Sequence, residues 1–255
     1  MIEVKNVTVR FGEKMVLDHV STTFHRGKTN LVIGRSGSGK TVLLKSIVGL
    51  VTVSEGEIIY DHVIFNQLDF TGQKKIRKEI GMLFQGSALF DSLNVEKNVM
   101  FPLDMFTDMS IDDKRERVNF CLQRVKLEKA NKLSPAELSG GMKKRVAIAR
   151  AIALNPKYLL CDEPNSGLDP QTAIVIDNLI REITEEYNMT TIVNTHDMNS
   201  VLEIGDKVTF IYNGRIEWEG TKDDILLSQN EHLDDFVFAS ELGKKIKASA
   251  MRDYR

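Results

Sequence analysis

The segment GRSGSGKT, at residues 34–41, combines glycines, small hydroxyl side chains and a lysine at the spacing G-x-x-x-x-G-K-T. Such a loop wraps its backbone N–H groups around phosphate oxygens. Lys40 is placed to contact the β- and γ-phosphates of a nucleotide, and the Thr41 hydroxyl to ligate Mg²⁺. We therefore expect a nucleotide site made by Gly34, Arg35, Ser36, Gly37, Ser38, Gly39, Lys40 and Thr41.

The elements around this loop suit that chemistry. The apolar run at 31–33 predicts a buried strand, and the apolar spacing from 42 to 48 predicts a helix. A plain glycine turn is the alternative interpretation. Because a phosphate-binding loop requires a strand before it and a helix after it, the context favours nucleotide binding.

A second candidate lies in YLLCDEP, at residues 158–164, an apolar strand that ends in two carboxylates. Neighbouring strand residues face opposite ways, so the two side chains can have different roles. We expect Asp162 near Mg²⁺ and its waters, and Glu163 near the water that attacks the γ-phosphate. A solvated Asp-Glu pair in a loop is the alternative, which the preceding apolar strand disfavours.

Two further polar residues follow predicted core strands. Gln85 follows 80–84 and His196 follows 190–194. Open α/β sheets bind ligands at the carboxyl ends of their strands. We expect Gln85 to contact Mg²⁺ or the attacking water, and His196 the γ-phosphate, although a single histidine is more often structural.

A serine and two glycines, Ser139, Gly140 and Gly141, precede a predicted helix. Exposed N–H groups at a helix start attract anions, so this is a second candidate anion site. Alone, the pattern is usually a capped turn. One nucleotide needs only one loop of this kind, which makes the second loop informative.

Composition limits the classes of protein. The 255 residues are 42% hydrophobic with a formal net charge of −2, which suits one α/β domain, or a core with a smaller lobe, and disfavours a general nucleic-acid binder. Cys121 and Cys161 fall in predicted core elements. There is no run of 18 apolar residues and no charged-then-apolar start, so we expect a soluble chain that stays inside the cell.

The remaining elements follow from periodicity. Near-alternating polarity from Ile2 predicts a strand that ends at Phe11-Gly12, and a second strand is predicted at 15–24. A further strand at 57–65 adds antiparallel structure. Apolar residues without strand alternation fill 86–102, which suggests either a contact surface or a packed lobe. Ser110 is a predicted helix cap. We expect an inserted helical lobe over about 89–155.

Taken in order, Phe11, GRSGSGKT (34–41), Gln85, LSGGM (138–142), YLLCDEP (158–164), SGLD (166–169) and His196 resemble the ATP-binding-cassette family over residues 1–222. The resemblance implies a P-loop NTPase core with an antiparallel β subdomain and an inserted helical subdomain. It implies that Phe11, otherwise equally a core residue, stacks on adenine, that Asp169 forms the D-loop, and that Glu163 polarises water. It also implies that Ser139 and Gly141 of one copy meet the γ-phosphate held by Lys40 of another.

Residues 86–103 and 138–152 resemble ATPases of bacterial lipid-transport systems. Met142 stands where most cassette ATPases have Gln, and the lipid-transport group resembles this chain in having Met there. Asn165 stands where Thr is more common, and we assign it no role. The resemblance implies a transport ATPase that binds ATP and Mg²⁺ and forms a homodimer. It also implies that the dimer binds membrane permease subunits on the cytoplasmic face of the inner membrane. A regulatory switch of the cell-division type stays open, and a DNA-repair or ribosome-associated role is disfavoured.

The domain boundaries follow from the same comparison. Residues 1–229 are expected to form one nucleotide-binding domain. Residues 230–255 form a tail with an apolar face and a basic end. The tail is either frayed or a clasp on the second copy or the permease.

Overall fold

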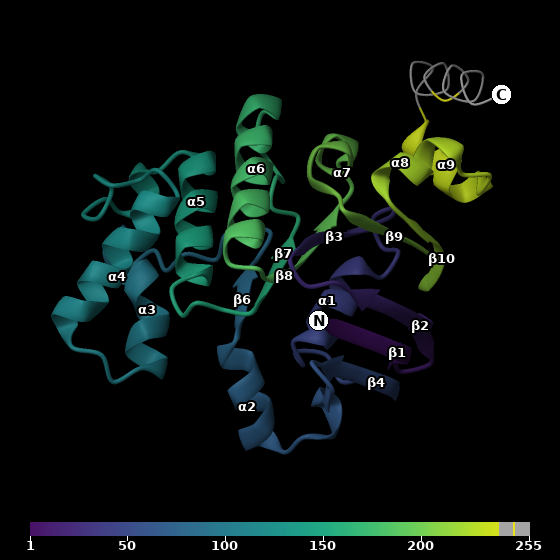
Figure 1. Ribbon diagram of the computed structural model, residues 1–255, viewed down its shortest axis with the longest axis horizontal. Coiled ribbons are helices and arrows are strands. Elements are labelled where there is room, and N and C mark those ends of the chain that lie inside the picture. Colours follow the sequence, from purple (N-terminus) through teal and green to yellow (C-terminus); the bar gives the residue numbers. More distant parts are fainter. Residues whose placement is uncertain (240–246, 248–255) are drawn as a thin grey trace.

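The computed structural model describes residues 1–239 and residue 247, which contain two β-sheets with helices around them (Figure 1). The larger sheet has the order β10-β9-β3-β8-β7-β6, in which β10 alone runs antiparallel to its neighbour. Its strands are β3 (Lys28–Ile33), β6 (Ile80–Leu83), β7 (Tyr158–Asp162), β8 (Thr190–Thr195), β9 (Lys207–Tyr212) and β10 (Arg215–Gly220).

The register aligns the carboxyl ends of the parallel strands. Ile33 lies opposite Thr195, and Asp162 lies opposite Asn194. The segments that follow β3, β6, β7 and β8 therefore leave the sheet at one edge, where an open parallel sheet binds its ligands.

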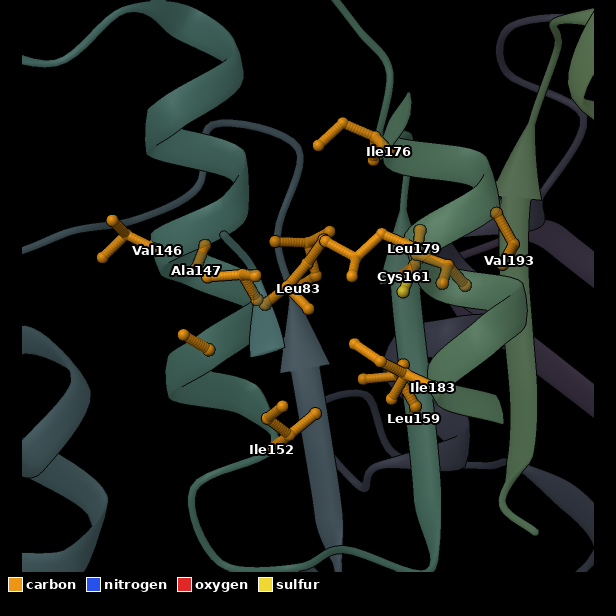
Figure 2. Close-up of a cluster of buried hydrophobic side chains, with 14 of the residues drawn as sticks. Leu83, Val146, Ala147, Ile152, Leu159, Cys161, Ile176, Leu179, Ile183 and Val193 are labelled. Atoms are coloured by element: carbon orange, nitrogen blue, oxygen red, sulfur yellow. The ribbon is translucent and has the colours of Figure 1, made fainter. Parts of the chain in front are cut away.

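Both faces of this sheet are buried, as parallel sheets require. Along β3, Leu31 and Ile33 belong to one apolar cluster and Val32 to another. The first cluster packs under α5 (Gly140–Ala151) and α6 (Pro170–Glu186). Figure 2 shows its side chains, which meet between these helices and the strands: Leu83, Val146, Ala147, Ile152, Leu159, Cys161, Ile176, Leu179, Ile183 and Val193.

The second cluster joins the other face to α1 (Lys40–Ile47) and a four-stranded antiparallel sheet of order β2-β1-β4-β5. These strands are β1 (Ile2–Phe11), β2 (Lys14–Phe24), β4 (Glu55–Tyr60) and β5 (Val63–Ile64). The continuous strand predicted at 57–65 is wrong. Asp61 and His62 have φ of +42° and +76°, so they form a two-residue turn that pairs Tyr60 with Val63. A 3₁₀ turn, Phe65–Gln67, follows.

Between β4 and β7 the chain is mostly helical. It forms α2 (Phe70–Lys78), α3 (Val95–Phe106) and α4 (Ile111–Arg124), followed by a 3₁₀ turn at Pro135–Glu137 and by α5. As predicted, Ser110 caps α4, since its side chain accepts a hydrogen bond from the Asp113 N–H. Helices α3, α4 and α5 pack against one another beside the β6 edge of the sheet (Figure 1).

The chain continues through α7 (Met198–Ile204), α8 (Lys222–Leu227) and α9 (Glu231–Val237). Helix α9 covers β9, because Leu233 is fully buried and the Phe236 ring lies 5.6 Å from that of Phe210. Among the described residues, no helix is both long and apolar enough to span a bilayer. The predicted clasp falls largely outside the described residues, including its basic positions Lys244, Lys245, Arg252 and Arg255.

Candidate active site

A cavity of about 580 Å³ opens at the carboxyl edge of the larger sheet. Its wall brings together residues from the loop after β3, the segments after β6, β7 and β8, and two elements, β2 and α9, that the sequence did not place at this site. The lining residues are Val16, Arg35, Ser36, Gly37, Gly39, Lys40, Thr41, Val42, Gln85, Glu163, His196 and Phe236. The expected phosphate loop, glutamine, carboxylate and histidine therefore share one space.

The loop after β3 depends on glycines at positions with positive φ and close protein contacts. Gly34 has φ of +150°, and a Cβ there would lie 2.3 Å from the Ile211 carbonyl oxygen. Gly39 has φ of +114°, and a Cβ would lie 2.8 Å from Leu17. The Ser38 hydroxyl is buried in the same loop with no hydrogen-bond partner among the described residues. The loop therefore offers unused polar capacity to an anion.

Lys40 is buried inside this loop. Its Nζ donates to the carbonyl oxygens of Gly34 at 2.8 Å and Arg35 at 3.2 Å. Burial lowers the pKa of Lys40, whereas the nearby Glu163 and Asp162 carboxylates raise it. A polyphosphate would supply further negative charge to the same ammonium group.

Oxygen ligands suitable for a magnesium ion lie beside Lys40. The Thr41 hydroxyl donates to Asp162 Oδ1 at 3.1 Å, and the same oxygen accepts from Asn194 Nδ2 at 3.1 Å. Mg²⁺ prefers a hydroxyl, one carboxylate, substrate phosphates and water. This donor set fits the ion, and the Gln85 side chain reaches the same cavity. Sequence reasoning missed Asn194, which is an ordinary strand residue until its neighbour is known.

Glu163 and His196 form a pair on the other side of the loop. Glu163 Oε2 lies 2.7 Å from His196 Nδ1, with the Glu163 side chain 14% exposed and that of His196 64% exposed. Glu163 has φ of +50°, a left-handed conformation that is uncommon for residues with a side chain. Asp162 contacts Thr41 and Glu163 contacts His196, so the two carboxylates have separate partners. Strand alternation does not explain this separation, because β7 ends at Asp162 and Glu163 lies beyond it in the left-handed conformation.

The Ser139 loop lies apart from this cavity. Ser139 caps α5 by accepting from the Met142 N–H at 3.2 Å, and both Ser139 and Gly140 are exposed. Gly141 is buried, and a Cβ there would lie 2.5 Å from the Thr172 side chain on α6. Asp169 caps α6 through the Thr172 N–H at 3.0 Å and does not line the cavity. Within one chain, the structure does not bring these residues to the phosphate loop.

The base-binding side of the cavity differs in part from expectation. Phe11 is 52% exposed, so it is not a core residue, and it lies outside the cavity lining. Val16 and Phe236 form apolar parts of that lining instead. The sequence carries no signal for Phe236, since α9 reaches the cavity only by packing on β9.

Comparison with known proteins is consistent with this geometry. Residues 17–166 match the family described as ABC transporter. The chain belongs to the ABC transporter family. It is therefore an ATPase of the ATP-binding-cassette type and uses ATP, as its sequence motifs predicted.

Two relatives of this ABC ATPase are named for different transport roles. The intermembrane phospholipid transport system ATP-binding protein MlaF of Haemophilus influenzae is 39% identical over 93% of this chain and 90% of its own length. The methionine import ATP-binding protein MetN of Campylobacter jejuni is 38% identical over 97% of this chain and 80% of its own. Both relatives are ATP-binding proteins of transport systems, although their cargoes differ.

Solved structures agree with the fold. The ATP-binding cassette MJ0796, in a dimeric post-hydrolysis state with ADP and Pi, matches with a TM-score of 0.79 and 35% identity over 87% of this chain and 99% of its own. CbiO1 of Clostridium perfringens, part of the transporter complex cbiONQ, matches with a TM-score of 0.83 and 28% identity over 96% and 98%. The predicted fold class, a cassette ATPase core with antiparallel and helical subdomains, is confirmed.

Proposed function

We propose that this ABC ATPase dimerises around two ATP molecules and drives a membrane permease that moves phospholipid or a similar amphiphile. The observation that carries the dimer is the separation of two anion-binding features. Lys40 lines the cavity, whereas the exposed Ser139 N-cap is not part of the cavity lining. A second copy in the opposite orientation would supply the missing Ser139 loop to each cavity.

In this proposal, each residue of the cavity has a defined task. Lys40 holds the β- and γ-phosphates, and Glu163 accepts a hydrogen bond from the attacking water and polarises it. His196 positions Glu163 through their 2.7 Å contact and reaches the γ-phosphate from the exposed side. A magnesium ion held by Thr41, Asp162 and Gln85 would neutralise charge on the phosphate oxygens.

A groove between α2, α3, α5 and β6 suits a permease segment. It measures about 450 Å³ and is lined by residues of α2, β6, α3, α5 and the loop after β6. Exposed aromatic rings give it an apolar wall, including Phe90 and Phe101, whose ring centroids are 4.6 Å apart. Arg77 and Arg150 add positive charge. A short amphipathic helix with apolar and acidic residues would match this surface.

The choice of phospholipid as cargo rests on sequence likeness. The segments at 86–103 and 138–152, with Met142 in the second, resemble lipid-transport ATPases, and MlaF is a relative at 39% identity. The MetN relative has a similar identity, so the same scaffold serves other cargo classes. The identity of the cargo therefore needs a direct test.

The test is to purify the chain from membranes together with its partners and to identify both the proteins and the bound lipid. The complex is then placed in nanodiscs of phosphatidylethanolamine and phosphatidylglycerol, and lipid-stimulated ATP hydrolysis is compared with methionine-stimulated hydrolysis. We expect stimulation by phospholipid, absent from the Glu163→Gln complex. Stimulation of hydrolysis by methionine alone would contradict the proposed cargo. Purification of the chain without any membrane protein would contradict the proposed partner.

A further inference from the structure

A lysine outside the nucleotide cavity connects three parts of the hydrolysis machinery. Lys144 lies on α5, five positions after Ser139, and is only 4% exposed. Its Nζ donates to the Gln85 carbonyl oxygen, and more weakly to the Glu163 carbonyl oxygen at 3.4 Å and to Ser166 Oγ at 3.4 Å. Ser166 Oγ in turn donates to the Gln85 carbonyl at 3.3 Å.

A buried cation at this place is costly. Removing an ammonium group from water is unfavourable unless charged or polar groups replace its hydration. Burial lowers the pKa of Lys144, which the negative charges of Glu163 and Asp162 oppose. No carboxylate of the described residues forms an ion pair with it, and its direct partners are two backbone carbonyls and a hydroxyl. An apolar side chain would fill the space at lower cost, so the amine requires a reason beyond packing.

That reason is found in the backbone of Glu163. Its left-handed conformation, at φ of +50°, is unfavourable for a residue with a side chain, because Cβ then lies too close to a backbone carbonyl oxygen. The Lys144 ammonium group contacts the carbonyl of this same residue, while the Glu163 side chain contacts His196. The contact therefore stabilises the peptide conformation that directs the carboxylate into the cavity.

The same helix also holds the chain after Gln85. Arg150, at the other end of α5, donates to the carbonyl oxygens of Ser87 and Ala88, both at 2.8 Å. Ser87 and Ala88 also have positive φ, of +64° and +48°. Two cations of α5 thus fix strained backbone at the ends of β6 and β7. A displacement of α5 would therefore move the backbone both after β6 and after β7.

We propose that Lys144 is a positioning residue that links the Ser139 helix to the Glu163 carboxylate, so that hydrolysis depends on the placement of α5. This rests on the proposed function, in which Ser139 contacts the nucleotide of a second copy. Docking of Ser139 would then be transmitted along α5, through Lys144, to Glu163 and Gln85 of its own chain. ATP binding at Lys40 does not need this link.

The first experiment separates rate from binding. In the Lys144→Met chain we expect kcat for ATP hydrolysis to fall roughly ten- to a hundredfold, with KM for Mg-ATP changed less than about twofold. Lys144→Arg should recover part of the loss because it keeps the charge and the N–H donors. Lys143→Met, at the neighbouring half-buried position, is the matched control and should behave as the parent chain. An equal loss in the control, or a loss that appears only in KM, would overturn the proposal.

The second experiment is a double-mutant cycle with Glu163→Gln, read by single-turnover hydrolysis. If Lys144 acts through Glu163, adding Lys144→Met to Glu163→Gln should change the residual rate less than about twofold. Multiplication of the two losses would show an independent role and contradict the link. If thermal unfolding and size-exclusion chromatography show that the Lys144→Met chain is not folded, Lys144→Gln takes its place in the cycle. Should Glu163→Gln alone hydrolyse normally, the proposed function fails rather than the link.

Discussion

The edge of the parallel sheet and the start of α5 both offer groups that bind anions, but they are built differently. At the sheet edge the side chains already contact one another, since Thr41 bonds Asp162 and Glu163 contacts His196. At the start of α5, Ser139 and Gly140 are exposed, and the Ser139 hydroxyl caps its own helix. One region is an assembled site, whereas the other is a surface that needs a ligand from elsewhere. The difference is what a catalytic site divided between two copies requires.

The largest expected effect breaks the assembled region. Glu163→Gln keeps the shape and hydrogen-bonding reach of the side chain but removes the charge that polarises water. ATP should bind normally while hydrolysis falls roughly 10²- to 10⁴-fold. The measurement is single-turnover hydrolysis beside equilibrium nucleotide binding, on the chain alone and in its membrane complex. Parental hydrolysis in the complex would remove Glu163 from the mechanism.

The next effect breaks the exposed region. In the Glu163→Gln background, Mg-ATP should hold two chains together, and adding Ser139→Arg should abolish that dimer because a bulky cation replaces the cap that meets the partner's γ-phosphate. Binding of ATP to the single chain should stay within about twofold, since Ser139 is outside the cavity.

Light scattering with Mg-ATP reads this prediction directly. Ser134→Arg is a suitable control, because Ser134 caps the nearby 3₁₀ turn rather than α5. A trapped dimer that forms equally well with Ser139→Arg would show that the two regions do not meet. The assay is repeated with the chain bound to its membrane partners, so that weak dimerisation of the isolated chain does not decide the result.

The sequence predicts these two regions to different depths. The phosphate loop and YLLCDEP could be recognised because strand, loop and helix are contiguous, and parallel strands then place their carboxyl ends at one edge. Asn194, Lys144 and Phe236 could not be predicted, because their roles depend on neighbours 32, 59 and 26 positions away in the chain. Their local patterns are those of an ordinary strand and ordinary helices.

The same limit applies to turns and to the glycines of the Ser139 loop. Neither Asp61 nor His62 is a glycine, so the sequence did not indicate their left-handed turn and a continuous strand was predicted. Gly141 suggested an exposed anion site, but its backbone lies against Thr172 of α6. Its lack of a side chain is needed for helix packing. Such close approaches are set by the tertiary fold and not by local propensity.

A smaller effect is expected at the edge of the assembled region. Phe11 is half exposed and lies outside the cavity lining, so its ring is not held in the core and can stack on a base. Phe11→Ala should weaken ATP by roughly 1–3 kcal/mol, seen mainly as a higher KM, because stacking acts in the ground and transition states alike. Val16→Ala, which alters the cavity wall itself, provides the comparison. A fall in kcat with KM unchanged would contradict a role in base binding.

The smallest expected effect concerns Asp177, a buried carboxyl on α6, the helix that Asp169 caps. It is 2% exposed on α6, and burial raises its pKa to about 6 although hydrogen bonds from Ser200 and Asn165 oppose this. The nearby carboxylates of Asp197 and Glu203 raise the pKa further. Asn165 Nδ2 also donates to Ser200 Oγ at 3.0 Å, and these two residues follow β7 and β8, which end at Asp162 and Thr195.

Because the folded pKa is higher than the unfolded value of 3.8, the folded chain holds more protons between these values. This carboxyl therefore lowers stability as pH rises from about 4 to about 6, and the loss stays constant above that. Asp177→Asn should raise the free energy of unfolding at pH 7.5 by on the order of 1–2 kcal/mol and change it little at pH 4. Urea unfolding at both pH values measures the difference, with Glu185→Gln as an exposed control on the same helix. A gain of equal size at both pH values would show that packing, and not the buried charge, explains the effect.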